Sequence, residues 1–238
     1  MKKLSAFIFL LLASHYSLFA QKEIITQASE LIVARNYNEA NRYLDSVLKK
    51  NPKSVDALMM KGNVILNYGL DTTPALQFIS KADESVFTTS VTEKPKRLSQ
   101  KTAFAVAKVW IRCLKMDSTR TDIRKGLCTV YAMALMKDSL KKEISRLLKA
   151  EQDDGEQAFR TCEYARNFKE RNRFDDAMEI YWFIAQKFPA VAGIRCDIAS
   201  EYYYNGRMKE ALVWLDSCFR FKEIDETSFL NGAYIYSE

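Results

Sequence analysis

Few side chains in this chain of 238 residues could do chemistry. It has five cysteines, none in a Cys-x-x-Cys spacing, and one histidine, His15. Beyond His15 the chain can form neither a Ser-His-Asp or Cys-His catalytic group nor a histidine metal site. It also contains no glycine-rich phosphate loop and no nucleophile elbow. Enzymes can work with Asp, Glu, Lys and Tyr alone, but we expect no catalytic residue, no metal and no cofactor.

The cysteines favour a disulfide over a metal site. Cys162 and Cys196 are 34 residues apart. We interpret them as equivalent positions on neighbouring helices, about 8–10 Å apart and too distant to be joined. Cys218 falls on the buried side of a helical pattern, where we expect an ordinary small apolar side chain. Cys113 and Cys128 lie symmetrically about a predicted turn, so an antiparallel helix pair would place them level. We hypothesise a disulfide between these two.

An acid-rich stretch, EQDDGEQ at residues 151–157, could hold a cation. It lacks the ligand spacing of a calcium loop. We favour a solvated loop between helices.

The first twenty residues, MKKLSAFIFLLLASHYSLFA, predict an export signal. Lys2 and Lys3 precede an apolar run that is shorter than the roughly 20 residues needed to span a bilayer. Small residue Ala20 then marks a cleavage site. We expect an exported protein, periplasmic or secreted, with no membrane span in the mature chain. A retained membrane anchor is the alternative.

The charge balance argues against a nucleic-acid partner. The chain has 36 Lys and Arg against 30 Asp and Glu, and the basic residues are spread along the sequence rather than clustered. Its length allows one sizeable core or an array of small units.

A period of 34 residues runs through both ends of the chain. NRFDDAMEIYWFIAQKFP begins at Asn172 and GRMKEALVWLDSCFRFKE begins at Gly206, so that Ala177 matches Ala211. The same offset links Ala165, Ala199 and Ala233. Self-similarity at this period indicates stacked helix-turn-helix units.

The stretch from Phe174 to Pro189 shows why each unit would be helical. Its apolar residues follow spacings of three and four, which place them on one buried stripe. Pro189 ends the segment because it cannot continue the hydrogen-bond ladder. Trp182 lies off the stripe, and we expect it to be the most exposed of the large side chains.

These residues resemble the tetratricopeptide repeat family, as found in exported bacterial proteins. Its pattern asks for a small residue in the first helix, glycine or a polar residue at the turn, alanine in the second helix and a closing proline. The small first-helix position is filled by Ala28, Gly62, Ala165, Ala199 and Ala233. Turn glycines stand at Gly69 and Gly206, and second-helix alanines at Ala40, Ala177 and Ala211, with Ala75 one residue late. The resemblance implies an all-α repeat solenoid.

The resemblance divides the chain into four parts. We predict a signal peptide at 1–20, N-terminal repeats at 21–82, a divergent helical section at 83–157, and C-terminal repeats with a terminal capping helix at 158–238. In the divergent section the 34-residue frame places Tyr131 where a small residue is expected and Glu143 where the second-helix alanine is expected. Residues 83–100 read as a loop and residues 101–116 as one apolar helix. Whether the native chain continues past Glu238 stays open.

The resemblance also implies where a partner would bind, because partners of this family usually lie along the concave groove. We expect a non-catalytic scaffold that binds a protein or peptide of the cell envelope. The groove residues would be Asn63, Asn67, Phe159, Arg166, Lys169, Tyr203, Tyr204 and Tyr234. Tyrosine and arginine are typical interface anchors, although the same residues could be solvated charges and half-buried rings. Two alternatives are an accessory part of a larger envelope enzyme and a structural subunit of an envelope assembly.

Overall fold

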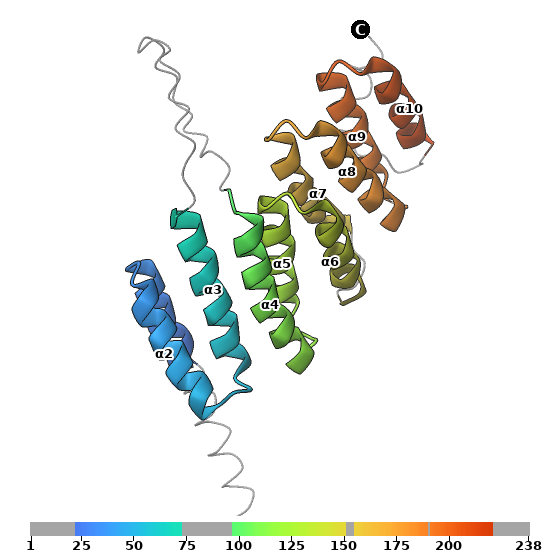
Figure 1. Cartoon of the computed structure of the whole chain (residues 1–238). Coiled ribbons are helices and arrows are strands. Elements are labelled where there is room, and N and C mark those ends of the chain that lie inside the picture. The colour runs from blue at the N-terminus through green and yellow to red at the C-terminus, as the bar shows by residue number, and fades with distance from the viewer. Residues whose placement is uncertain (1–21, 73–96, 151–154, 190, 221–238) are drawn as a thin grey trace, which may run out of the picture. The chain divides into compact units, whose positions relative to one another are not determined.

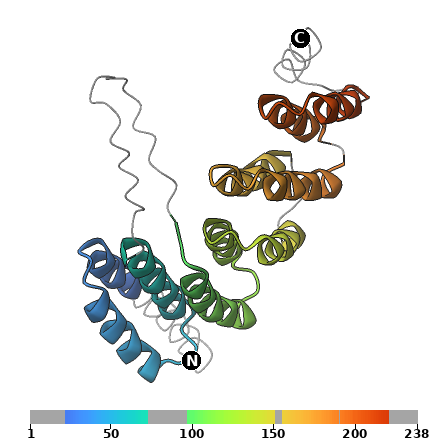
Figure 2. The same cartoon turned by 45° about the horizontal axis from the view of Figure 1, so that its top comes forward.

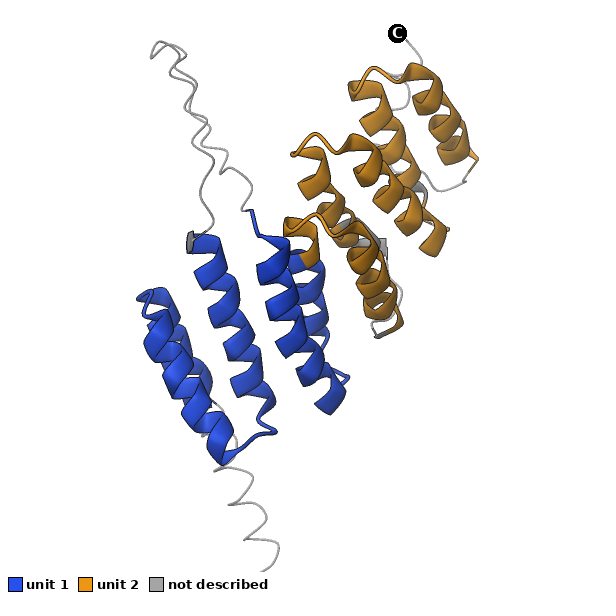
Figure 3. Ribbon diagram, in the orientation of Figure 1, with its two compact units in different colours: residues 1–130 blue, residues 131–238 orange. Residues whose placement is uncertain are grey.

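A computed structural model describes residues 22–72, 97–150, 155–189 and 191–220, and the structural statements below concern these residues. The predicted signal peptide, Ala75, Ala233, Tyr234 and the terminal capping helix lie outside them. All regular secondary structure in the described residues is helical, as the repeat pattern predicts. The chain forms two compact units, residues 1–130 and 131–238, which we treat separately (Figure 3). The predicted divisions after residues 82 and 157 stay predictions.

Unit 1 begins with a helix over residues 22–33. It continues with α2 (Tyr37–Lys50), α3 (Val55–Thr72), α4 (Gln100–Met116) and most of α5 (Thr121–Met133) (Figure 1). Unit 2 contains α6 (Lys137–Ala150), α7 (Gly155–Lys169), α8 (Phe174–Lys187), α9 (Ala192–Tyr204) and α10 (Met208–Phe219). In unit 2, α7 packs on α8 and α9 packs on α10 (Figure 1, Figure 2).

Four turns between helices share one geometry. Arg35, Leu135, Asn172 and Gly206 have left-handed backbone angles, and each precedes the next helix by two residues. In each turn this residue's amide donates to the carbonyl three residues back, and the following amide donates to the carbonyl five back. This is the Schellman motif, which satisfies helix-end carbonyls. The turn predicted at Gly206 is confirmed.

The turns also reveal the true register of the divergent section. The small first-helix position lies seven residues before each turn residue, and the second-helix alanine lies five after it. In the α5–α6 segment these positions hold Cys128 and Leu140, which are fully buried. The assignment of Tyr131 and Glu143 to these positions is therefore wrong by three residues. The cause is α7, which starts ten residues before Ala165, whereas α9 starts seven before its own alanine.

The turn predicted at Gly69 is also wrong, because α3 continues through it. Instead of turning, α3 packs along α4. A Cβ atom on Gly69 would lie 2.3 Å from Cγ2 of Thr102 on α4. The absence of a side chain therefore serves close helix contact rather than a left-handed turn. The apolar helix predicted at 101–116 is confirmed as α4, and the Ser99 side chain caps its start by accepting a hydrogen bond from the amide of Thr102.

Trp110 of α4 forms the centre of unit 1. Its indole nitrogen donates a hydrogen bond to the carbonyl of Met59, and a Cβ atom on Gly62 would lie only 2.0 Å from that nitrogen. On the other side, a Cβ atom on Gly126 of α5 would lie 2.8 Å from the indole ring. Two glycines on different helices thus make room for one large aromatic side chain.

The hypothesised disulfide between Cys113 and Cys128 is contradicted. Both residues are buried, but the Cys113 thiol faces α3, where it donates to the carbonyl of Val55 at 3.8 Å. Burial raises the pKa of the Cys113 thiol to about 11. The disulfide joins Cys196 on α9 to Cys218 on α10, with Cα atoms 5.5 Å apart, so both were wrongly expected to be unpaired.

The helix over the repeated aromatic stretch behaves as its pattern predicts. Ala177, Tyr181 and Ile184 of α8 are buried, whereas Trp182 is 49% exposed. Among the described residues, no helix has both the length and the apolar character needed to cross a bilayer.

Candidate functional site

A pocket of about 260 Å³ lies between α7 and α9 in unit 2. α7 contributes Cys162, Glu163 and Arg166, α8 contributes Tyr181, and α9 contributes Asp197, Ser200, Glu201 and Tyr204. α7 and α9 are the first helices of two successive hairpins, and Tyr181 comes from the second helix of the earlier hairpin. The pocket therefore arises where the repeat pattern places partner-binding side chains.

Charged side chains surround the pocket. Arg166 donates to Glu163 at 2.9 Å along α7, and the Lys169 ammonium contacts both carboxylate oxygens of Glu201 on α9, at 2.6 and 2.8 Å. The second pair connects the two helices across the pocket. Asp197 adds a third carboxylate. The lining thus holds three carboxylates and one guanidinium.

The buried groups of the pocket stay neutral. Burial raises the pKa of the Cys162 thiol, and the nearby carboxylates of Asp197 and Glu163 raise it further. Burial also raises the pKa of the Tyr181 hydroxyl, with Glu201 adding to the effect. Near neutral pH, Cys162 is therefore a thiol rather than a reactive thiolate. The pocket offers ionic and hydroxyl contacts rather than an activated nucleophile.

The aromatic rim comes from the end of α9. The Tyr203 and Tyr204 rings meet edge to face with centroids 5.4 Å apart, and Tyr204 is 76% exposed. An exposed tyrosine presents a rigid apolar ring and a hydroxyl, which suits contact with another chain.

The structure brings only part of the predicted set together. Arg166 and Tyr204 line the pocket, and Lys169 and Tyr203 lie beside it. Phe159 falls within α7, but its side chain and all of Tyr234 lie outside the described part of the chain. The partner-binding role of all these residues stays a prediction.

Asn63 and Asn67 lie in unit 1, one turn apart on α3. Both are half-buried, and the Asn67 amide donates to the carbonyl of Asn63 at 2.8 Å. They form a separate polar surface that we describe for unit 1 alone.

Sequence reasoning missed the acidic half of the pocket. Glu163 and Asp197 are 34 residues apart and so occupy equivalent positions of successive repeats. The period that identified the alanines could therefore also have identified this acidic pair. Tyr181 was predicted as core, and it is buried while still lining the pocket.

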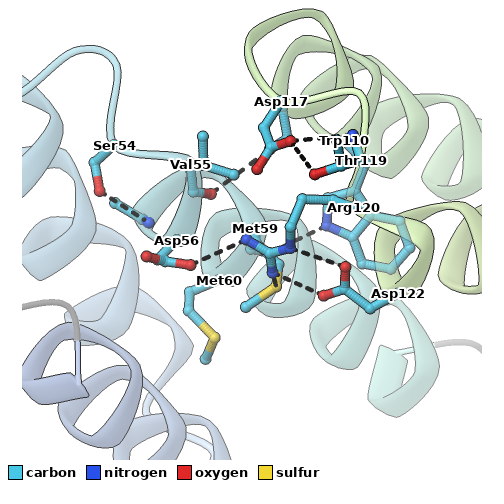
Figure 4. A network of polar contacts seen from close by, with 12 residues as sticks. Ser54, Val55, Asp56, Met59, Met60, Trp110, Asp117, Thr119, Arg120 and Asp122 are labelled. Carbon is cyan, nitrogen blue, oxygen red and sulfur yellow. Dashed lines mark hydrogen bonds and ion pairs between the residues drawn. The ribbon is translucent and has the colours of Figure 1, made fainter. Parts of the chain in front are cut away.

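A second polar cluster joins α3 and α5 in unit 1 (Figure 4). The Arg120 guanidinium donates to Asp56 at 3.2 Å and to Asp122 at 2.7 Å, and it reaches the sulfur of Met59 at 3.0 Å. The hydrogen bond from Arg120 lowers the pKa of Asp122. Since Arg120 satisfies both acids, we interpret this cluster as a fixed connection between helices rather than a binding site.

Groups of three or more potential metal ligands are not found in the described residues. The repeated hairpins, each with a small buried residue and a Schellman turn, define a tetratricopeptide-type fold. This is the class of protein that the architecture and the first-helix pocket indicate.

No family model matches the chain, and no curated protein matches it in sequence. The solved structure of the MamA protein overlays with 13% identity and a TM-score of 0.47, covering 84% of this chain and 90% of that one. YrrB, described as a TPR protein with an unusual peptide-binding site, overlays with 13% identity and a TM-score of 0.43, covering 90% and 91%. A tetratricopeptide repeat protein from Parabacteroides merdae gives 11%, 0.44, 90% and 70%. The similarity is one of helical arrangement.

Proposed function

We propose that this protein is an exported, non-catalytic scaffold that binds a segment of another envelope protein in the pocket between α7 and α9. The observation that carries the proposal is the pocket itself, because successive first helices supply its charged groups and an exposed tyrosine. A volume of about 260 Å³ is below the roughly 300–1,000 Å³ of typical small-molecule sites. It suits one side chain of a longer segment.

The charge of the lining favours a basic side chain from the partner. Three carboxylates face one guanidinium, and Lys169 neutralises only Glu201 at the rim. A lysine or arginine of the partner would pair with Asp197 and Glu163 while its stem packs against Tyr204. The support for export is the N-terminal pattern alone.

Site-specific crosslinking tests the proposal. A photoreactive amino acid would replace Tyr204 in the pocket, and a matched one would replace Val213, an exposed residue of α10. After irradiation of intact cells, we expect a discrete protein adduct from position 204 and none from position 213. Mass spectrometry of the same sample should show a mature chain that begins at Gln21.

Affinity for the crosslinked partner then tests the named residues. The double variant Arg166→Glu, Tyr204→Ala should bind at least roughly 30-fold more weakly in calorimetry, because it removes two anchors. The control Lys187→Glu, Trp182→Ala removes an exposed cation and an exposed aromatic from α8. Equal losses in the two variants, or equal adducts from positions 204 and 213, would reject the pocket as the binding site.

A further inference from the structure

The outward side of α4 carries an unusual charge pattern. α4 contains four cations, Lys101, Lys108, Arg112 and Lys115, and no acidic residue. All four are exposed. Spacings of three, four and seven residues place them on one side of the helix, opposite the side on which Trp110 and Cys113 are buried. With Phe104 and Ile111, which share this side, they form what we call the α4 outer face.

The cations of the α4 outer face lack acidic neighbours. In the part of the chain that the structure describes, none of them forms an ion pair. Arg112 donates to the uncharged carbonyl of Pro52 at 3.4 Å. α2 shows the usual arrangement, because its exposed cations share their surface with Glu39 and Asp45, and Asp45 pairs with Lys61. The positive charge of α4 is therefore uncompensated within its own unit.

The sequence composition of unit 1 extends this pattern. Residues 1–130 hold 20 Lys and Arg against 11 Asp and Glu, whereas residues 131–238 hold 16 against 19. The even balance of the whole chain conceals this difference. A net charge of one sign attracts surfaces of the opposite sign over roughly a Debye length.

Two large apolar side chains interrupt the cations. Phe104 is 59% exposed and Ile111 is 36% exposed, two helical turns apart. An anionic polymer would use the cations and gain little from these side chains. A bilayer surface would use both, since lysines contact anionic head groups while phenylalanine and isoleucine enter the acyl boundary. The face from Lys101 to Lys115 extends about 20 Å along the helix, which allows such contact along its length.

We propose that the α4 outer face binds the surface of a membrane that contains anionic lipids, with α4 lying parallel to that surface. This goes beyond the scaffold function and does not depend on the pocket in unit 2. It is also a different claim from a membrane span, because the buried side of α4 stays packed on α3.

Vesicle binding tests the proposal on the chain that begins at Gln21, so that the apolar N-terminal segment cannot itself bind lipid. The probes are vesicles of equimolar phosphatidylcholine and phosphatidylglycerol, and vesicles of phosphatidylcholine alone. We expect cosedimentation with the first and not with the second. The triple variant Lys101→Gln, Lys108→Gln, Lys115→Gln should bind anionic vesicles roughly 100-fold more weakly, because each surface cation contributes to the attraction.

A matched variant controls for net charge. Arg42→Gln, Lys49→Gln, Lys50→Gln removes the same charge from the exposed side of α2 and should weaken binding less than about threefold, because these positions do not touch the lipid surface. Phe104→Ser should weaken binding roughly tenfold. Val33→Ser, at a residue that is 84% exposed on another helix, should leave it unchanged. Far-UV circular dichroism would show that each variant stays helical.

Three results would overturn the proposal. The first is equal binding of the native chain to both kinds of vesicle. The second is an equal loss in the α4 and α2 triple variants. The third is tighter binding to polyglutamate or duplex DNA than to anionic vesicles, with Phe104→Ser having no effect, which would assign the α4 outer face to an anionic polymer instead.

Discussion

The α3–α4 pair of unit 1 and the α9–α10 pair of unit 2 achieve close helix contact in different ways. In α9–α10, Ala199 meets Ala211 and Leu215, a three-residue turn joins the helices, and a disulfide connects them. In α3–α4, residues 73–99 separate the two helices in sequence. Their contact is made by Trp110 against Gly62.

The difference shows that contact distance and side-chain size can be exchanged across a helix pair. Small residues on both helices allow a close approach, as the tetratricopeptide pattern requires. A glycine facing a tryptophan fills the same space with one large ring, which adds a directional hydrogen bond to the carbonyl of Met59. The α3–α4 contact therefore depends on one residue, whereas the α9–α10 contact is spread over several residues and a covalent bond.

The largest expected effect follows from removing that one residue. Trp110→Ala should lower the free energy of unfolding by about 3–5 kcal/mol, because it leaves a cavity between two glycines and an unsatisfied carbonyl. Urea unfolding followed by circular dichroism measures it. Trp182→Ala is the control, since Trp182 is about half exposed, and it should cost under about 1 kcal/mol. Similar losses in the two variants would show that Trp110 is not the centre of unit 1.

The next effect concerns the covalent bond of the α9–α10 pair. The disulfide closes a separation of 22 residues, so reduction should lower the free energy of unfolding by about 3 kcal/mol. Dithiothreitol should have no such effect on the variant Cys196→Ala, Cys218→Ala. The denatured chain should show three reactive thiols before reduction and five after it. Five thiols before reduction would contradict the disulfide.

The sequence period identified helices and buried positions well wherever the register was regular. Ala28, Ala165 and Ala199 are fully buried at the predicted small positions. It failed at Gly69, because a glycine seven residues after the small position resembles a turn, whereas the fate of α3 depends on contacts from Thr102 far along the chain. Local pattern cannot report which distant helix will cover a surface.

The pocket and the disulfide were only partly visible for a related reason. Arg166 and Tyr204 were found by residue type, whereas Asp197 becomes informative only when two helices are placed side by side. Cys196 and Cys218 lie ten and twelve residues from Gly206, which is the same near-symmetry that suggested Cys113 and Cys128. Symmetry in sequence leaves the rotation of each helix undetermined, and rotation decides which thiols meet.

The smallest effect compares two glycines, one in each pair. Gly206 has a φ of +73° with no atom near its absent Cβ, whereas Gly62 is helical and its Cβ would collide with Trp110. Gly206→Ala should therefore cost only the backbone term, about 1–2 kcal/mol. Gly206→Asn should cost less, because asparagine tolerates this conformation, as Asn172 shows at the equivalent turn. Gly62→Ala should cost more than either, despite the higher helix propensity of alanine. Urea unfolding of the three variants orders them, and a Gly62→Ala chain as stable as the native one would show that the two helices do not depend on the glycine.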